Sequence, residues 1–338
     1  MFPSTAIFNT RIDDTSKFPA HANSWSWISM VGSGTPFVAN WGVTDDQADV
    51  SYYGIPYNVV DGSPGTTDWP VLSYNFALSG VNTLLGYADK SDCAVPSGNG
   101  FAMQRNCSGV QASQVHFPYP KWNVQSEHGT TCNDANACGD HHVLVLEKGA
   151  CRLWESYYAY NIWGSWFSMA TAAWDLKSLS LRPQNWASAD AAGLPITPLL
   201  AKAVEANSGE IKHALRMTFR NAAISGGEYS WPARFTAGGG GWGTIPMGSL
   251  LRLRADFVIP SNWTPQAKAV ATAAKQYGIY VADNGPDFHI QGAPSSAWGG
   301  WDTYNQLHGI SLSNMEFVDL KAVTGSPKFN VDSMQASW

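Results

Sequence analysis

Apolar and polar residues alternate most clearly in the middle of the chain, between residues 142 and 158. An apolar run over 142–147 and a second run over 151–158 are separated by the turn residues Lys148 and Gly149. Two such runs joined by a short turn are typical of a β-hairpin. The pattern therefore predicts two antiparallel strands in this segment.

Further short apolar runs, each bounded by Gly, Asn or Pro, predict four more strands. They lie at residues 211–219, 249–257, 279–282 and 288–291. Two other segments begin with Thr followed by Pro and continue as alanine-containing runs, which is typical of the start of a helix. These segments predict helices at residues 197–206 and 264–276.

The first 140 residues lack both periodicities. Residues 1–90 contain short candidate strands among many Pro and Gly residues, and we expect this irregular segment to wrap a sheet. Residues 90–140 are rich in Ser, Asn and Gly, and we expect a loop region held by disulfides, followed by the sheet core over 141–338. Because no linker or internal repeat interrupts the chain, the sequence predicts a single domain over 1–338. The predicted fold class is mainly β with α+β margins, a large jelly-roll-like β-sandwich with two or three peripheral helices and long loops.

Composition narrows the classes of function. Hydrophobic residues make up 44% of the 338 residues and charged residues 14%, against about 25% in an ordinary soluble domain, which excludes a disordered chain. The net charge of −6 argues against nucleic acid as a partner, because a phosphate backbone is bound by a basic surface. No window approaches about eighteen consecutive apolar residues, so we expect no membrane span and no membrane partner.

Cysteines and glycosylation sequons bear on the cellular compartment. Four cysteines flank two short loops in the pairs Cys93 with Cys107 and Cys132 with Cys138. This spacing suggests two loop-closing disulfides, although cysteine counting alone does not fix the pairing, and Cys151 is expected as a buried free thiol. With the sequons at 106–108 and 262–264, the disulfides predict a secreted, extracellular glycoprotein. The N-terminal residues lack the basic and apolar regions of a signal peptide, as in a mature form.

Four carboxylates are candidates for catalysis, because each lies on a strand face or where a loop meets a regular element. Glu155 alternates with apolar residues along the hairpin, and such surroundings favour the protonated carboxyl group that a general acid requires. Asp140 enters the same hairpin, Asp190 lies in a loop of small residues, and Asp283 ends a strand. The structural alternatives are a sheet-edge or Arg-paired position for Glu155 and ordinary turn or helix-cap roles for Asp190 and Asp283.

Aromatic, basic and amide side chains near these acids are candidates for substrate binding. They are His142, Trp154, Tyr157, His213, Arg216, Trp231, Arg234, Asn284 and His289. His213 and Trp231 have core packing as the commoner alternative. Arg216, Arg252 and Arg254 are expected on one sheet face, either solvated or forming a groove that binds carboxylate or sulfate groups.

Motifs of several known chemistries are absent. The chain has no Gly-x-Ser-x-Gly or His-Glu-x-x-His, and the glycine-rich run at 238–243 lacks the Lys-Ser/Thr of a phosphate loop. We expect no cofactor and assign no metal ligand. Metal binding by residues 127–128 with 140–142, or Ca²⁺ binding by Asn133, Asp134 and Asp140, is an alternative with unspecific spacing.

The strings at 188–196, 213–216, 231–234 and 282–285, with the hairpin from Asp140 to Glu155, resemble a group of secreted, uncharacterised microbial proteins. The resemblance covers residues 140–320. It implies an extracytoplasmic protein of one domain, and it implies neither an activity nor catalytic residues.

Carbohydrate is the partner that these features favour. Sixteen Trp residues offer flat apolar faces for sugar rings, low charge suits a neutral polymer, and several acids lie at strand ends. The leading hypothesis is a secreted glycoside hydrolase with paired carboxylates, Glu155 and one of Asp190, Asp140 or Asp283. The alternatives are a lyase that acts on a uronate polymer with Arg and Tyr or His, and a non-catalytic lectin. The sequence leaves the oligomeric state open.

Overall fold

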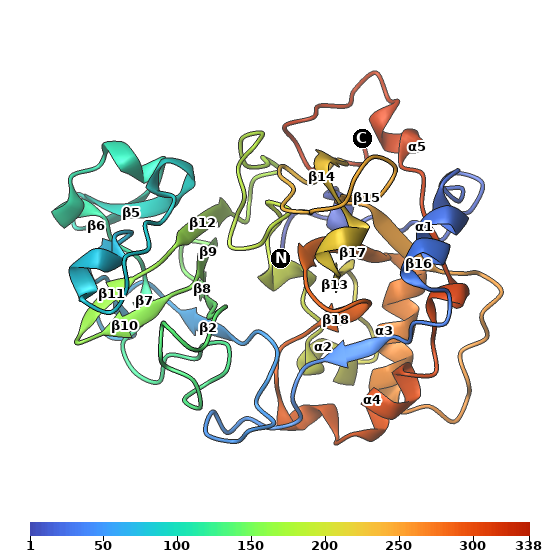
Figure 1. Cartoon of the computed structure of the whole chain (residues 1–338), viewed down its shortest axis with the longest axis horizontal. Helices are drawn as coiled ribbons and strands as arrows, with labels where there is room; N and C mark the ends of the chain where they lie inside the picture. The colour runs from blue at the N-terminus through green and yellow to red at the C-terminus, as the bar shows by residue number, and fades with distance from the viewer. The chain divides into compact units, whose positions relative to one another are not determined.

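A computed structural model describes residues 1–338 (Figure 1). Nineteen strands form six sheets, and five α-helices accompany them. The prediction of a mainly β fold with few helices is confirmed, and the arrangement is consistent with a β-sandwich-like fold. None of the helices combines the length and the apolar character that crossing a bilayer requires.

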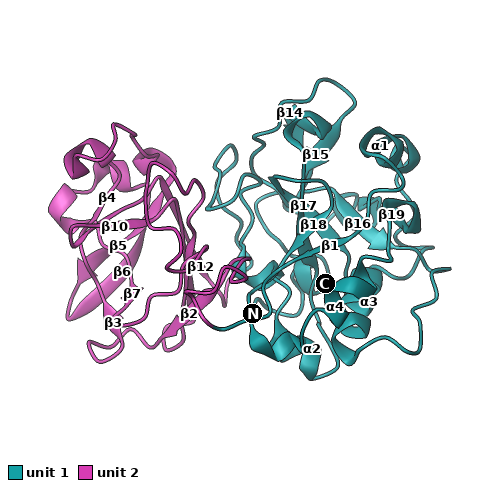
Figure 2. Cartoon of the chain, turned by 60° about the horizontal axis from the view of Figure 1, so that its bottom comes forward, with its two compact units in different colours: residues 1–45, 179–338 teal, residues 46–178 magenta.

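The chain divides into two compact units (Figure 2). Unit 1 contains residues 1–45 and 179–338, and unit 2 contains residues 46–178. The sequence analysis expected one continuous domain instead. Unit 2 is inserted into unit 1, and the chain crosses between them near residues 45–46 and 178–179, where no Pro-rich or Gly-rich linker marks the boundary.

The largest sheet of unit 2 has four strands in the order β12-β9-β8-β2. Their bounds are Tyr57–Val60 for β2, Val143–Glu147 for β8, Arg152–Tyr157 for β9 and Ala170–Asp175 for β12. Strands β8 and β9 pair antiparallel, which confirms the predicted hairpin. Strand β2 adds to β8 in parallel, a pairing between segments more than 80 residues apart that no local pattern could predict.

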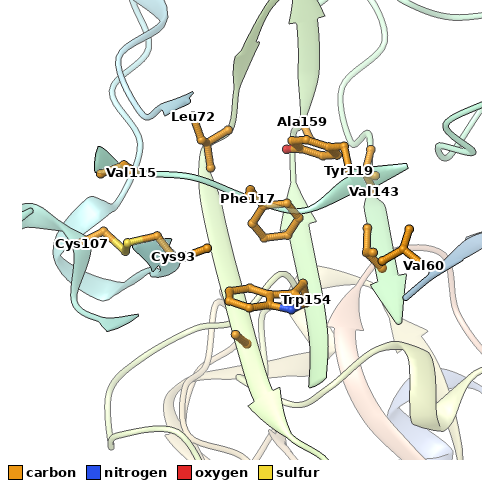
Figure 3. Packing of buried hydrophobic residues seen from close by; sticks show 13 residues of the cluster. Val60, Leu72, Cys93, Cys107, Val115, Phe117, Tyr119, Val143, Trp154 and Ala159 are labelled. Atoms are coloured by element: carbon orange, nitrogen blue, oxygen red, sulfur yellow. A yellow bond between two sulfur atoms is a disulfide. The ribbon is translucent and has the colours of Figure 1, made fainter. Parts of the chain in front are cut away.

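Smaller sheets complete unit 2. One contains β4 (Leu72–Ser73), β10 (Tyr160–Ile162) and β11 (Ser165–Phe167), and two strand pairs are β3 (Thr67–Asp68) with β7 (Tyr119–Pro120) and β5 (Asp92–Ser97) with β6 (Gly100–Arg105). One face of the four-stranded sheet packs against these pieces. Trp154, Phe117, Tyr119 and Val143 lie at the centre of this core (Figure 3).

Both expected disulfides are present in unit 2. Cys93 is bonded to Cys107, and Cys132 to Cys138. The first bond joins β5 to the turn after β6 and lies in the core (Figure 3). Cys151 is a free thiol, as expected, but it lies in the turn before β9 and is partly exposed, whereas we expected it to be buried.

The largest sheet of unit 1 has six strands in the order β1-β18-β13-β17-β16-β19. Their bounds are Val38–Asn40 for β1, His289–Gln291 for β18, Leu215–Phe219 for β13, Ile279–Asn284 for β17, Leu250–Leu253 for β16 and Met315–Phe317 for β19. Strands β13 and β16 are shorter than the runs predicted for them. A separate pair contains β14 (Ile224–Tyr229) and β15 (Ile245–Met247).

All five α-helices lie in unit 1. The second predicted helix is confirmed as α3 (Pro265–Gln276), which Thr264 caps. Helix α3 packs against β16 (Figure 1). The first predicted helix is divided into a 3₁₀ turn (Thr197–Leu199) and α2 (Ala203–Asn207), because Ala201 forms a bridge to Gly292 and is extended. The helices that the sequence analysis missed are α1 (Ser24–Val31), α4 (Asp302–Leu307) and α5 (Lys321–Thr324).

The core disulfide of unit 2 has a testable contribution to stability. It closes a loop with a sequence separation of 14. A double Cys93→Ser, Cys107→Ser variant is expected to lower the free energy of unfolding by about 3 kcal/mol, because the unfolded chain regains the entropy of that loop. Urea unfolding measures the change. Cys151→Ser is the matched control and is expected to stay within about 0.5 kcal/mol of the parent. Equal stability of the two variants would contradict the assignment.

Candidate functional site

Three charged side chains converge in unit 1 at the centre of the six-stranded sheet. Nη2 of Arg216, on β13, lies 3.1 Å from Oδ2 of Asp190 and 3.6 Å from Oδ2 of Asp283. The side chains of Arg216 and Asp190 are fully buried, whereas that of Asp283 is 21% exposed. One guanidinium therefore neutralises one buried carboxylate and pairs with a second that solvent reaches.

A β-bulge places Asp283 on the same sheet face as Arg216. Strands β13 and β17 run parallel, and the register shifts between Met217 and Thr218 by one residue, Ala282. Side chains alternate between the faces of a strand, so without this extra residue Asp283 would point to the opposite face. With the extra residue, Asp283 lies opposite Thr218. Thr218 follows Arg216 by two residues on β13, so all three side chains share one face of the sheet. Bulges are frequent next to active sites because they redirect a side chain in this way.

Asp190 lies in a loop whose shape is fixed by its own carboxylate. Its Oδ1 accepts hydrogen bonds from the Ser188 hydroxyl at 3.1 Å and from the Leu194 amide at 3.1 Å. The loop turns at Gly193, with a φ of 71°, where an added Cβ would lie 2.5 Å from the carbonyl oxygen of Trp186. Asp190 is thus held firmly, with one oxygen bound within the loop and the other directed to Arg216.

Asp283 has a more open environment. Its Oδ1 accepts a hydrogen bond from the Asn284 amide at 2.8 Å. In the sheet, Thr218 lies between Asp283 on β17 and His289 on β18, so these three residues form one row across three strands. Burial lowers the pKa of His289, against the opposing effect of Asp287, and this favours the neutral imidazole. The row therefore presents an ionisable carboxylate and a neutral ring on one face.

Buried polar atoms beside the trio have no hydrogen-bond partner in the protein. They are Nε and Nη1 of Arg216 and the hydroxyl of Tyr280. Tyr280 lies directly opposite Arg216 in the sheet, and burial raises its pKa, so the phenol keeps its proton. Since buried polar groups are normally paired, these donors form a cluster of unmet hydrogen-bonding capacity in the same row of the sheet as Arg216.

The other candidate residues of unit 1 are committed to the fold. Arg234 is buried, pairs with Asp332 and donates to the carbonyl of Val331. The indole of Trp231 donates to the carbonyl of Ser333 and packs edge-on against Phe329. These contacts support the loop segment 231–234, whose residue Arg234 donates its amide to Ala192 beside the Asp190 loop.

The expected arginine face is only partly present. Arg252 shares the sheet face of Arg216, because Leu250 pairs with Tyr280, which in turn lies opposite Arg216. Arg252 is buried and pairs with Glu316. Arg254 lies beyond the end of β16 and pairs with Asp256 in solvent. Neither arginine is thus available to bind an anionic sugar.

His213 belongs to a different cluster, which the sequence analysis missed. Its Nε2 lies 2.9 Å from Oε2 of Glu205, and the ammonium group of the buried Lys202 lies 3.4 Å from the same oxygen. Burial works against ionisation of Glu205, but the hydrogen bond from His213 and the charge of Lys202 bring its pKa to about 2. Spacing along α2 could have suggested the Lys202–Glu205 pair, whereas the contact with His213 depends on tertiary folding.

The candidates of unit 2 lie on its four-stranded sheet. Glu155 is fully buried, and it lies on the face opposite the Trp154 core, between Leu144 on β8 and Ala172 on β12. Trp154 is fully buried, so its indole offers no face to a sugar, and its Nε1 donates to Glu147 at 2.9 Å. Tyr157 is half-buried on the face of Glu155.

The entrance to the hairpin holds a histidine–carboxylate pair. Nδ1 of the buried His142 lies 2.6 Å from Oε2 of Glu127 and its ring is tilted against Tyr157 at 5.4 Å. Burial opposes ionisation of Glu127, but the charge and hydrogen bond of His142 lower its pKa. Asp140 is exposed two residues earlier. No group of three or more His, Cys, Asp and Glu side chains is arranged to hold a metal ion.

Comparison with known proteins finds no family model, no curated protein and no solved structure that matches this chain. The candidate site is therefore defined by geometry, and the Asp190–Arg216–Asp283 trio is its centre. Three of the residues that the sequence analysis named separately meet there. Thr218, Tyr280 and Ser188, which position them, were missed because their roles follow from strand register and loop shape.

Removing a buried arginine and removing an exposed arginine are expected to lower the free energy of unfolding by different amounts. Arg216→Met leaves the buried Asp190 without a counter-charge and is expected to lower the free energy of unfolding by about 3–5 kcal/mol. Arg254→Met, which removes the exposed ion pair with Asp256, is expected to cost no more than about 1 kcal/mol. Urea unfolding of both variants tests this, and equal losses would show that Arg216 does not neutralise a buried charge.

The Glu205 cluster predicts a loss of stability in acid. The pKa of Glu205 is about 2 in the folded chain against an ordinary 4.5, so the unfolded chain binds the proton first as the pH falls. Its stabilising contribution is complete above pH 4.5 and is lost between pH 4.5 and 2. Glu205→Gln is expected to flatten the unfolding free energy across this range, measured by urea titrations at successive pH values. An unchanged slope would contradict the assigned pKa.

Proposed function

We propose that the chain is a secreted glycoside hydrolase and that Asp283 is its reacting carboxylate. The observation that carries this proposal is the sharing of one buried guanidinium by two carboxylates, of which Asp283 is the one partly exposed to solvent. A cation within ion-pair distance favours the charged form of a carboxylate. Asp283 is thus suited to act as a nucleophile or as a base, and Asp190 to position Arg216.

The reaction needs two groups with opposite protonation states. In the retaining form, an oxygen of Asp283 bonds to the anomeric carbon as the glycosidic C–O bond breaks, and water then displaces it. In the inverting form, Asp283 takes a proton from a water molecule whose oxygen bonds to that carbon. In both forms the leaving oxygen receives a proton from a neutral acid. Glu155, the acid that the sequence favoured, is fully buried within unit 2, so we assign no proton donor at the trio, which belongs to unit 1.

A hydroxyl-rich ligand suits the polar atoms beside the trio. Nε and Nη1 of Arg216 and the neutral O–H of Tyr280 are donors without a partner in the protein, and the partly exposed carboxylate of Asp283 is an acceptor. Mixed donors and acceptors match the hydroxyl groups of a sugar, each of which both donates and accepts. Binding would satisfy these buried groups.

Local charge favours a hydrolase over the alternative lyase. A lyase acting on uronate units needs positive charge to neutralise the substrate carboxylate. Arg216 carries one positive charge against the two negative charges of Asp190 and Asp283, which leaves the trio with net charge −1. Because Arg234 and Arg252 are paired with acids of their own, a neutral glycan is the better substrate class.

Secretion is part of the proposal. Two disulfides are compatible with an extracellular protein, because such bonds persist in oxidising compartments. The sequon residues Asn106 and Asn262 are both exposed, as attachment of a glycan requires.

The activity is tested by a screen of neutral plant, algal and microbial polysaccharides that reads both reducing ends and unsaturated products. Asp283→Asn is expected to lower turnover at least about 100-fold, because an amide neither attacks carbon nor takes a proton. The matched control is Asp287→Asn, whose side chain is also 21% exposed and also paired with an arginine, and it is expected to keep its activity. Unsaturated products, or full activity of Asp283→Asn, would refute the proposal.

The role that the sequence predicts for Glu155 has a separate test. If Glu155 is the acid, Glu155→Gln loses turnover while its melting temperature stays close to that of the parent. A large fall in melting temperature would assign Glu155 to the fold instead. A substrate with a good leaving group provides a further check, since it needs no proton and is expected to restore the first step.

A further inference from the structure

We propose that unit 2 carries a second, non-catalytic site that binds a neutral glycan, in the pocket lined by Trp69 and Phe101. The ligand class rests on the proposed function, whereas the site is separate from the Asp283 trio and stands on its own contacts. The pocket has a volume of about 450 Å³, within the range of small-molecule sites. All the residues that line it belong to unit 2.

Aromatic rings form one wall of this pocket. The rings of Trp69 and Phe101 are stacked, with centroids 4.4 Å apart and planes 14° from parallel. Trp69 also packs edge-on against the buried Trp154, at 6.1 Å, so the core supports the wall from behind. Both wall residues are only partly buried. A fixed, partly exposed aromatic surface is the feature on which the apolar face of a pyranose ring packs.

Charged side chains at fixed positions line the pocket as well. Glu147 is buried, accepts a hydrogen bond from Nε1 of Trp154 at 2.9 Å, and lies 3.8 Å from Nη1 of Arg152. Arg152 donates to the carbonyl of Phe101 at 3.0 Å, and its side chain remains 28% exposed. Guanidinium and carboxylate groups next to an aromatic wall are suited to bind the hydroxyls of a sugar whose ring stacks there.

The rim adds polar groups with defined charge. Hydrogen bonds from Thr66 and Ser63 lower the pKa of the exposed Asp61 to about 2, so this carboxylate is ionised under ordinary conditions. The ion pair of Glu147 and Arg152 is neutral overall, which leaves a negative charge at the rim. An anionic glycan would be repelled, and the pocket is therefore suited to a neutral one.

The pocket is pre-organised by covalent and backbone constraints. The Cys93–Cys107 disulfide fixes the β5–β6 hairpin that carries Phe101. On the other side, Gly62 has a φ of 80°, and an added Cβ would lie 2.8 Å from Oε1 of Glu147. A rigid binding site loses little conformational entropy when a ligand binds.

Titration calorimetry with cellohexaose, mannohexaose, xylohexaose and chitohexaose tests the site, with a hyaluronan hexasaccharide as the anionic comparison. The protein used is the full-length Asp283→Asn variant, which retains the unit 2 pocket. At least one neutral hexasaccharide is expected to bind, and Trp69→Ala is expected to weaken that binding at least about tenfold, in line with loss of an aromatic contact. Trp122→Ala removes an exposed indole that does not line the pocket and is expected to leave affinity unchanged.

A blocking variant covers the case in which Trp69→Ala does not fold. Gly100 lines the pocket, and an added Cβ there meets no atom within 4 Å, so Gly100→Leu is expected to fill the pocket and abolish binding without disturbing the core. The inference is overturned if no neutral hexasaccharide binds, if the hyaluronan fragment binds best, or if affinity is unchanged in both pocket variants. Loss of binding in these variants together with full turnover by Asp283→Asn would retain this site and refute the proposed catalytic one.

Discussion

The buried guanidinium of Arg216 is the constraint on which the candidate site depends. A fully buried carboxylate such as Asp190 is costly unless it is paired and hydrogen-bonded, and Arg216 together with Ser188 and Leu194 meets that requirement. The same cation lies near Asp283 at the open side of the trio. The interaction that permits a buried Asp190 thus also places a positive charge beside Asp283, the carboxylate that we propose as the reacting group.

The two proposed binding surfaces belong to different units of the chain. Unit 1 supplies the trio from a parallel strand pair with a bulge, and unit 2 supplies an aromatic pocket from a disulfide-bonded hairpin. In both places a rigid element carries the functional side chains, as accurate binding requires. Unit 2 has its own core around Trp154, so its pocket needs no support from the residues of the trio.

The sequence predicted those elements that depend on residues close together in the chain, such as a tight turn or a helix cap. The hairpin of β8 and β9 follows from alternation and a short turn, and α3 follows from the Thr264 cap and the proline after it. The first predicted helix was only partly right, because the extended residue Ala201 pairs with Gly292, far away in the chain. Asp190, Arg216 and Asp283 could each be picked out as candidates. Their convergence could not be predicted, since it requires the parallel pairing of β13 with β17 and a one-residue bulge.

Carboxylate labelling can show whether Asp283 is the reacting carboxylate. The protein would be treated with a water-soluble carbodiimide and an amine, and modification of each acid would be followed by peptide mapping alongside hydrolytic activity on the polysaccharide found in the screen. We expect activity to fall in step with modification of Asp283. A bound oligosaccharide is expected to slow both the modification of Asp283 and the loss of activity, and the buried Asp190 is expected to stay unmodified. Full activity after complete modification of Asp283, or loss of activity while Asp283 is intact, would contradict it.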